Sequence, residues 1–180
     1  MAQTNILLEA GTNELEIVEF YIDEQGSGST YQGFYGVNVA KVLEIIRLPQ
    51  VTHLPAAVHP SVRGTFNLRN KVIPLVDLAM WLGKDTPASE NDKVIVVNAF
   101  RVSGVTRIHR LSWSDIEPPS RHVAKFSEDS VTGVVRIENR VVFLLDMERI
   151  VGELNPTLGL KALDASQAVT SDFRYRALIA

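Results

Sequence analysis

Residues 62–83, VRGTFNLRNKVIPLVDLAMWLG, decide the fold because the chain repeats them as residues 131–152, VTGVVRIENRVVFLLDMERIVG. The two segments align without a gap at a constant offset of 69. Glycine, asparagine and aspartate recur in register together with the apolar residues, so chance similarity between short strands is a poor explanation. The identical pairs are Val62/Val131, Gly64/Gly133, Asn70/Asn139, Val72/Val141, Leu75/Leu144, Asp77/Asp146 and Gly83/Gly152. Two copies of one supersecondary unit therefore build the protein.

A second repeated pair lies upstream of these blocks. Residues 39–48, VAKVLEIIRL, match residues 102–111, VSGVTRIHRL, at an offset of 63. The blocks follow the same order in both halves, which extends the duplication over most of the chain. Many short strands and few helices then predict an all-β fold, and two related halves predict two small β-barrels.

Each copy of the longer repeat has an asparagine between two strand-like runs, Asn70 in the first and Asn139 in the second. Asparagine tolerates positive φ better than other residues except glycine. We therefore expect a tight β-hairpin in each copy, with the asparagine at the turn.

An aspartate follows the second strand of each copy. We expect it to accept hydrogen bonds from the free N–H groups of a short helix. The aspartates are Asp77 and Asp146, the helices cover 78–82 and 147–151, and Gly83 and Gly152 would end them. Paired carboxylates also suit acid–base catalysis. Their identical place in two repeats favours capping over that alternative.

Three other segments complete the expected elements. The change of parity between Ile17 and Val18 predicts a bulge or a strand buried on both faces. Residues 23–30 contain glycines but no Gly-Lys-Ser/Thr, so they form a polar loop and not a phosphate loop. Residues 31–39 and 42–48 have the β-branched and aromatic composition of strands.

Composition narrows the function classes. The 180 residues are 46% apolar and 22% charged, which is typical of a globular protein, and the net charge of -3 argues against a protein that coats nucleic acid. There is no cysteine, which excludes disulfides and thiolate metal sites and suits a reducing cytoplasm. The sequence shows no signal peptide and no apolar stretch of membrane-spanning length.

Motifs for catalysis are absent from the sequence. The four histidines, His53, His59, His109 and His122, show no metal-ligand spacing. The chain has no GxSxG, Walker or GxGxxG motif. We therefore expect no enzyme activity, no cofactor and no metal site.

The segment 62–78 resembles the most distinctive block of the CheW family of bacterial chemotaxis adaptors. Supporting blocks are residues 35–46 and 131–151, so the similarity covers about residues 14–152. The residues of 62–78 that match the family pattern are Gly64, Asn67, Leu68, Arg69, Pro74, Asp77 and Leu78. The resemblance implies two packed, intertwined five-stranded SH3-like barrels with short helices.

Two further blocks, residues 6–20 and 102–119, are similar to CheV, a hybrid that joins a CheW-like domain to a phosphorylatable receiver domain. The end of the chain, RYRALIA, resembles the first strand of a receiver, which implies a piece of a longer protein. The expected organisation is an N-terminal extension with a short helix (1–13), a CheW-like domain (14–152), a C-terminal helix or linker (153–172) and the start of a receiver (173–180).

The resemblance also implies a function. Family members are not enzymes but bridge the cytoplasmic tips of chemoreceptors to the histidine kinase CheA. We therefore expect a cytoplasmic adaptor recruited to receptor arrays at the inner membrane, without insertion into the membrane and monomeric in isolation. Signal transduction in a two-component system is the expected context.

Six residues match family positions implicated in partner contacts or lie beside them: Lys41, Val42, Glu44, Gly64, Asn67 and Arg69. Arg69 is the strongest candidate, because its repeat equivalent is Glu138 and the duplicated scaffold therefore needs no cation there. An intramolecular salt bridge is the alternative role for Arg69. Core packing is the alternative for Val42, and a conformational requirement is the alternative for Gly64.

The sequence departs from the family at two places. Asn70 replaces the usual glycine, and residues 94–105 leave almost no room for a turn, which makes the strands of that half uncertain. A small-barrel nucleic-acid-binding protein is the alternative function, supported by the cations Arg63, Arg69 and Lys71. It is disfavoured because only Phe66 lies among them to stack on bases.

Overall fold

The computed structural model describes residues 13–25, 29–54, 59–84, 86, 89–97, 99–120 and 130–158. The short helix expected in the N-terminal extension, over 2–10, and the expected receiver strand lie outside these residues. The strands are β1 (Glu14–Gln25), β2 (Thr30–Asn38), β3 (Glu44–Arg47), β4 (Val62–Leu68), β5 (Lys71–Asp77), β6 (Lys93–Val96), β7 (Phe100–Val102), β8 (Gly104–Ser112), β9 (Ile116–Glu117), β10 (Val131–Ile137) and β11 (Arg140–Leu145). The helices are η1 (Val39–Lys41), α1 (Leu78–Trp81), η2 (Trp113–Asp115) and α3 (Met147–Leu158).

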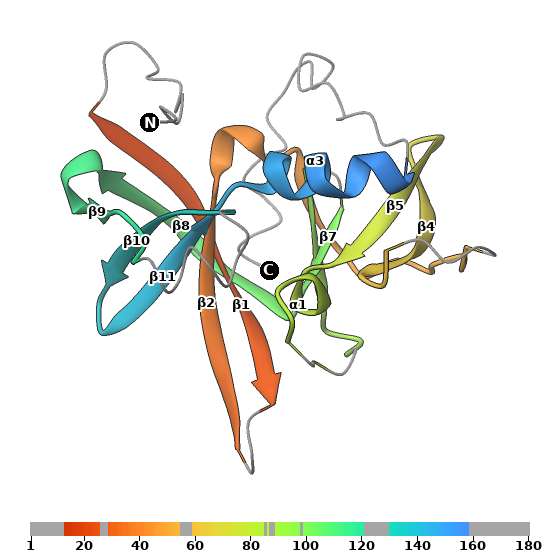
Figure 1. Cartoon of the computed structure of the whole chain (residues 1–180), viewed down its shortest axis with the longest axis horizontal. Helices are drawn as coiled ribbons and strands as arrows, with labels where there is room; N and C mark the ends of the chain where they lie inside the picture. Colours follow the sequence, from red (N-terminus) through yellow and green to blue (C-terminus); the bar gives the residue numbers. More distant parts are fainter. Residues whose placement is uncertain are drawn as a thin grey trace.

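The strands form two sheets, which confirms the predicted all-β, two-barrel architecture (Figure 1). We call the five-stranded sheet, ordered β3-β6-β7-β5-β4, barrel 1. Barrel 2 is the six-stranded sheet, ordered β8-β1-β2-β11-β10-β9. Barrel 2 thus has the expected five strands plus the two-residue β9 at its edge.

The two barrels share one plan. Strands β8-β1-β2-β11-β10 of barrel 2 correspond in order to β3-β6-β7-β5-β4 of barrel 1. The one parallel pair in each, β2–β11 and β5–β7, falls at the same place. The β-bulges also coincide, at Val62/Gly64 and at Val131/Gly133. The repeat in the sequence is therefore a repeat of structure.

The barrels are interleaved along the chain. Strands β1 and β2 come first in the sequence but pair with β8 and β11 of barrel 2. All five strands of barrel 1 lie between them and β8. Figure 1 shows β1 and β2 as a long hairpin that extends beyond the rest of barrel 2. Barrel 2 is consequently built from two separated parts of the chain.

Three apolar clusters hold this arrangement together. Barrel 1 has Phe66, Ile73, Leu75, Val94, Val96 and Ala99 in its interior, and barrel 2 has Ile17, Leu111, Val135, Ile137, Val142 and Leu144. The largest cluster joins β1 and β2 to β5–β7, α1 and α3, and includes Phe20, Phe100 and Ile150 at 0% exposure. Burial of this shared apolar surface is what packs the barrels against each other.

Both predicted hairpins form with two-residue turns. Leu68 pairs with Lys71, and Ile137 pairs with Arg140. In barrel 1, Arg69 and Asn70 have φ of 49° and 63°, as a type I′ turn requires. In barrel 2, Asn139 also lies at the turn as expected, but Glu138, with φ of 55°, is the residue in the left-handed region.

Both aspartates cap helices as predicted. Asp77 accepts a hydrogen bond from Met80 N at 3.3 Å, and Asp146 Oδ1 accepts one from Arg149 N at 3.0 Å. Gly83, with φ of 70°, ends α1 as expected.

The expectation for Gly152 is wrong, because α3 continues through this residue to Leu158. Ile150, Val151 and Leu154 are buried in the shared cluster, so tertiary packing outweighs the weak helix propensity of glycine. Among the described residues, no helix is long and apolar enough to cross a membrane.

Strands β6 and β7 pair as a hairpin, although the sequence of 94–105 left little room for a turn. β6 and β7 pair from Lys93↔Val102 to Ile95↔Phe100, and Ala99 takes φ of 68° in the turn. The parity change in β1 is a bulge between Val18 and Phe20, as predicted.

Candidate functional site

Arg69 and Glu44, two of the predicted site residues, meet on the surface of barrel 1. Arg69 lies at the tip of the β4–β5 hairpin, and Glu44 begins β3. Arg69 Nη2 lies 3.1 Å from Glu44 Oε2, and the two side chains are 79% and 25% exposed. The predicted intramolecular ion pair exists, yet most of the Arg69 side-chain surface remains open to a partner.

Asn67 lies beside this pair and supports the turn. Its Oδ1 accepts a hydrogen bond from Asn70 N at 3.0 Å, which helps to hold Arg69 in its positive-φ conformation. Val72, directly opposite Asn67 across the hairpin, is 74% exposed. The hairpin therefore presents a cation, an amide and an apolar side chain together, a combination that suits protein contacts.

Gly64 lies further along β4 and has a structural reason to be glycine. Its φ is +144°, and a Cβ atom there would lie 2.3 Å from Thr52 O and 2.7 Å from Val51 Cγ1. Thr52 and Thr65 exchange two backbone hydrogen bonds of 2.8 Å, which hold the Thr52 segment against β4. The geometry accounts for Gly64 without a partner.

Lys41 and Val42 face toward barrel 2 and not toward the Arg69 hairpin. Val42 is half-buried against the shared cluster, which fits its alternative role in core packing. Lys41 Nζ lies 2.8 Å from Glu148 Oε1 at the start of α3. The six predicted residues thus divide into a surface group of Glu44, Asn67 and Arg69 and a group with evident packing or pairing roles.

Barrel 2 carries the same ion pair with its charges exchanged. Glu44 corresponds to Arg107 at offset 63, and Arg69 corresponds to Glu138 at offset 69. Arg107 Nη2 pairs with Glu138 Oε1, and these side chains are 55% and 62% exposed. The sequence offsets alone would have paired these four residues, but the prediction compared only Arg69 with Glu138.

A buried charge cluster in barrel 2 escaped the sequence prediction. Glu19 is 0% exposed at the β1 bulge, with Thr106 Oγ1 donating to its Oε2 at 2.7 Å and His109 Nε2 at 2.8 Å from the same atom. Burial acts to raise the pKa of the Glu19 carboxyl, but these hydrogen bonds and the Arg140 guanidinium outweigh burial and lower it. The cluster joins β1, β8 and β11, and a glutamate at a parity change was its only signal.

The comparisons with known proteins agree with this geometry. A family profile described as CheW-like domain matches residues 17–155. Chemotaxis protein CheV3 of Helicobacter pylori is 38% identical over 152 residues, which are 79% of this chain and 49% of that protein. Chemotaxis protein CheW of Thermotoga maritima is 28% identical over 158 residues, 82% of this chain and 94% of that protein.

A solved structure shows the same fold. The crystal structure of scaffolding protein TtCheW from Thermoanaerobacter tengcongensis superposes with a TM-score of 0.61 at 22% identity, covering 73% of this chain and 88% of that one. The chain spans about half the length of the CheV3 relative, whereas it spans nearly all of the Thermotoga maritima CheW.

Proposed function

Since the chain belongs to the CheW-like domain family, we propose that it is a chemotaxis adaptor that couples chemoreceptors to the histidine kinase CheA. The proposed partners are the cytoplasmic receptor tip and CheA, and the protein acts as a noncatalytic scaffold in the cytoplasm at receptor arrays. Family membership and the relatives named CheW and CheV3 support this proposal.

The exposed Arg69 on the barrel 1 hairpin is the observation that carries the proposed docking surface. Its side chain is 79% exposed, and the contact with Glu44 restricts its conformation before a partner binds. Arginine is also enriched among residues that contribute most to interfaces. We place Glu44, Asn67 and Arg69 at the centre of this surface and Val72 beside them, with Lys41, Val42 and Gly64 in supporting positions.

We also propose the domain organisation that the resemblance of the sequence to CheV implies. Residues 14–152 form the CheW-like domain, 1–13 an N-terminal extension, 153–172 a helix or linker, and 173–180 the beginning of a receiver. A receiver would supply phosphorylation control of the CheW-like domain.

Isothermal titration calorimetry tests the adaptor proposal. The chain is titrated with the regulatory domain of its cognate CheA and, separately, with a soluble receptor tip. We expect both to bind, and we expect Arg69→Glu to weaken binding of at least one partner about tenfold or more, which corresponds to roughly 1.4 kcal/mol.

Two matched variants separate docking from scaffold effects. Glu138→Arg reverses the equivalent tip of barrel 2 and is expected to leave that binding within about twofold. The double variant Glu44→Arg/Arg69→Glu restores an ion pair with the polarity that barrel 2 uses. It should fold normally but remain weak in binding. If the double variant binds as well as the wild type, Arg69 serves only the internal pair, and absence of binding to both partners contradicts the adaptor function itself.

A further inference from the structure

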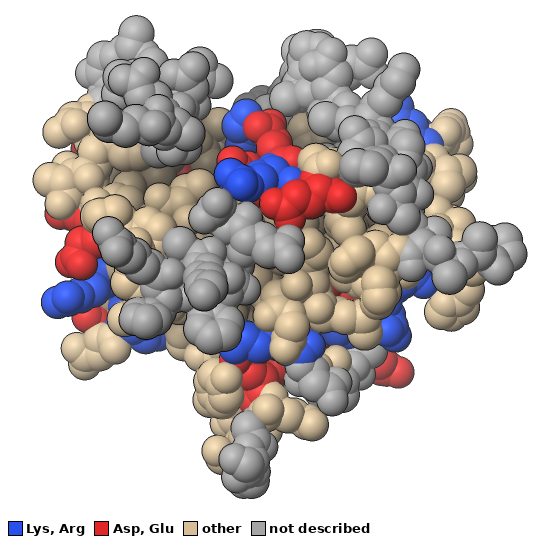
Figure 2. Space-filling model, viewed as in Figure 1, with Lys and Arg blue, Asp and Glu red and all other residues tan. Residues whose placement is uncertain are grey.

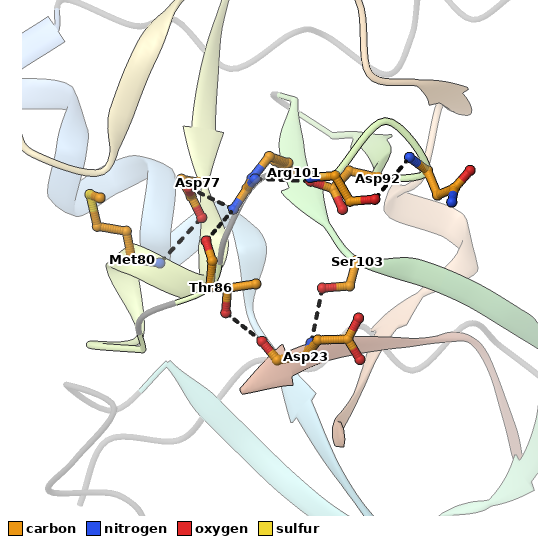
Figure 3. Close-up of polar contacts among 9 residues, drawn as sticks. Asp23, Asp77, Met80, Thr86, Asp92, Arg101 and Ser103 are labelled. Atoms are coloured by element: carbon orange, nitrogen blue, oxygen red, sulfur yellow. Dashed lines mark hydrogen bonds and ion pairs between the residues drawn. The ribbon is translucent and has the colours of Figure 1, made fainter. Parts of the chain in front are cut away.

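The interior of barrel 1 is closed at one end by a buried arginine, Arg101 in β7 (Figure 3). Its Nη2 lies 2.9 Å from Asp77 Oδ2, and its Nη1 lies 2.9 Å from Asp92 Oδ2. The three side chains are 6%, 4% and 3% exposed, respectively. Arg101 Nη2 also donates to Thr86 O at 3.3 Å. These contacts fill the mouth of the barrel with a guanidinium held between two carboxylates.

Strand pairing identifies the equivalent positions in barrel 2. Asp77 pairs with Arg101 across the parallel strands of barrel 1. In barrel 2 the parallel register runs through Leu144↔Gly36, so Asp146 and Asn38, two residues on, are the equivalents. Asp92 lies two residues before Val94, just as Leu15 lies two residues before Ile17, and Val94 and Ile17 lie in the interiors of their barrels. Barrel 2 therefore keeps the first aspartate but has Asn38 in place of the arginine and Leu15 in place of the second aspartate.

A pocket of about 230 Å³ occupies this mouth of barrel 2. Its apolar wall comes from Leu15, Ile17, Val37, Trp113, Ile116, Leu144, Leu145 and Met147, and its polar rim comes from Asn38, Lys41, Thr132, Asp146 and Glu148. Asp146 and Glu148 are acidic and Lys41 is basic, so the rim of the pocket carries a net charge of -1 when all three are ionised. Figure 2 shows acidic and basic side chains interspersed above the middle of the face that it displays.

Asp146 resembles Asp77 in using one carboxylate oxygen as a helix cap, so that the second oxygen can face a cation. Each aspartate uses Oδ1 to cap its helix, through Met80 N in barrel 1 and Arg149 N in barrel 2. Asp77 then uses Oδ2 to hold Arg101. Among the residues that the structure describes, no partner for Asp146 Oδ2 is present, so its second oxygen is available. Asn38 does not replace the arginine, because its Oδ1 accepts from Ala40 N at 2.9 Å to cap η1.

We propose that this pocket receives an arginine side chain from a partner protein, which takes the place that Arg101 occupies in barrel 1. The guanidinium would bond to Asp146 Oδ2 and lie near Glu148, while its methylene groups pack on the apolar wall. A lysine fits this arrangement less well, because it lacks the planar fork that bonds two acceptors. The inference is independent of the adaptor proposal, and of the six predicted site residues only Lys41 lines the pocket.

Nuclear magnetic resonance titration of the full chain tests the proposal with a small probe. The probe is Nα-acetyl-L-arginine amide, and the matched controls are the lysine and norleucine amides. We expect saturable shifts at the backbone amides of Asn38, Leu145 and Asp146, with the arginine probe binding at least about tenfold more tightly than norleucine. Equal affinity for arginine and norleucine would overturn the proposal in favour of an apolar occupant, and absence of saturable shifts at these residues would overturn it outright.

Two substitutions locate the probe. Asp146→Asn keeps a residue that can cap α3 but removes the charge, so it should weaken the arginine probe about tenfold and leave norleucine unchanged. Asn38→Arg supplies the missing side chain from within, so it should abolish probe binding and raise the melting temperature. Glu90→Gln, at an exposed position outside the pocket, serves as the control and should change neither. Retained arginine binding in both pocket variants would contradict the proposal.

Discussion

Barrel 1 and barrel 2 use one plan and differ at two places, the barrel mouth and the hairpin tip. The mouth of barrel 1 is closed by Arg101, whereas the mouth of barrel 2 is an open pocket beside Asp146. The hairpin tips carry the same ion pair with opposite polarity. The identical pairs Gly64/Gly133, Asn70/Asn139 and Asp77/Asp146 form bulges, turns and caps, whereas the barrel mouths and the ion pairs beside them differ.

The largest expected effect concerns the closed mouth of barrel 1. Arg101→Met leaves Asp77 and Asp92 buried without their counter-ion, so we expect a loss of about 3–5 kcal/mol in the free energy of unfolding. Urea denaturation measures this loss. Asn38→Ala, at the equivalent position of barrel 2, removes only the η1 cap and should cost about 1 kcal/mol. Similar losses for the two variants would show that the mouths do not differ as described.

A second comparison concerns the glycines at the two bulges. Gly64→Ala places a Cβ atom 2.3 Å from the backbone oxygen of Thr52 at positive φ, so we expect a cost of about 2–3 kcal/mol. The equivalent Cβ in Gly133→Ala would lie 2.6 Å from Ile116 Cγ2, a side-chain atom that can move, so about 1 kcal/mol is expected. Thermal unfolding of both variants checks the order. A Gly64→Ala protein of normal stability that fails to bind partners would instead assign Gly64 to docking.

Acid should change the stability contributions of Glu19 in barrel 2 and Asp92 in barrel 1 in opposite directions. Because the pKa of Glu19 is lowered from 4.5, its contribution to stability is present above pH 4.5 and is lost as the pH falls through the folded-state pKa. Burial raises the pKa of Asp92 from 3.8, so its contribution is present below pH 3.8 and is lost as the pH rises through the folded-state pKa. Relative to wild type, Glu19→Gln should flatten the loss of stability below pH 4.5, and Asp92→Asn should steepen it. Denaturation curves between pH 3 and pH 7, roughly the range of carboxyl titration, decide the signs.

The smallest expected effect is on the exposed hairpin pairs. Arg69→Ala and Glu138→Ala each remove one partner of a solvent-exposed ion pair, so each should cost only about 0.2–1 kcal/mol. Chemical denaturation in low salt and in high salt measures both. A cost above 2 kcal/mol for Arg69→Ala would make this residue a major part of the scaffold, which would weaken its assignment to docking.

Much of the fold could be predicted because the two copies of the repeat can be aligned with each other, which shows the positions that both barrels share. The hairpins around Asn70 and Asn139 and the caps at Asp77 and Asp146 follow from local rules that need no tertiary information. The prediction that Gly152 ends α3 was wrong because it depends on tertiary packing. Burial of Leu154 in the shared cluster extends α3 beyond Gly152.

The candidate site was predictable only in part. The motif around Arg69 identified the hairpin, but its contact with Glu44 depends on how β3 approaches the turn, which no local pattern specifies. The Arg101 cluster and the barrel 2 pocket depend on parallel pairing between strands distant in sequence. The offset of 63, extended one residue upstream of the repeated block 39–48, does relate Asn38 to Arg101. It does not place either residue opposite its aspartate, because that depends on the pairing of β2 with β11 and of β7 with β5.

The interleaving of the barrels sets an order of events during synthesis. Barrel 1 is a contiguous stretch of chain, but β1 must wait for β8, since Ile17 pairs with His109. At about 5–20 residues per second, the ribosome takes roughly 5–20 s to supply that partner. Until then the β1–β2 hairpin has open edges, and such edges promote aggregation. Early folding of β4–β5 and its neighbours would give the nascent β1–β2 hairpin an apolar surface to pack on while barrel 2 is incomplete. Pulsed hydrogen exchange on refolding would detect this early folding.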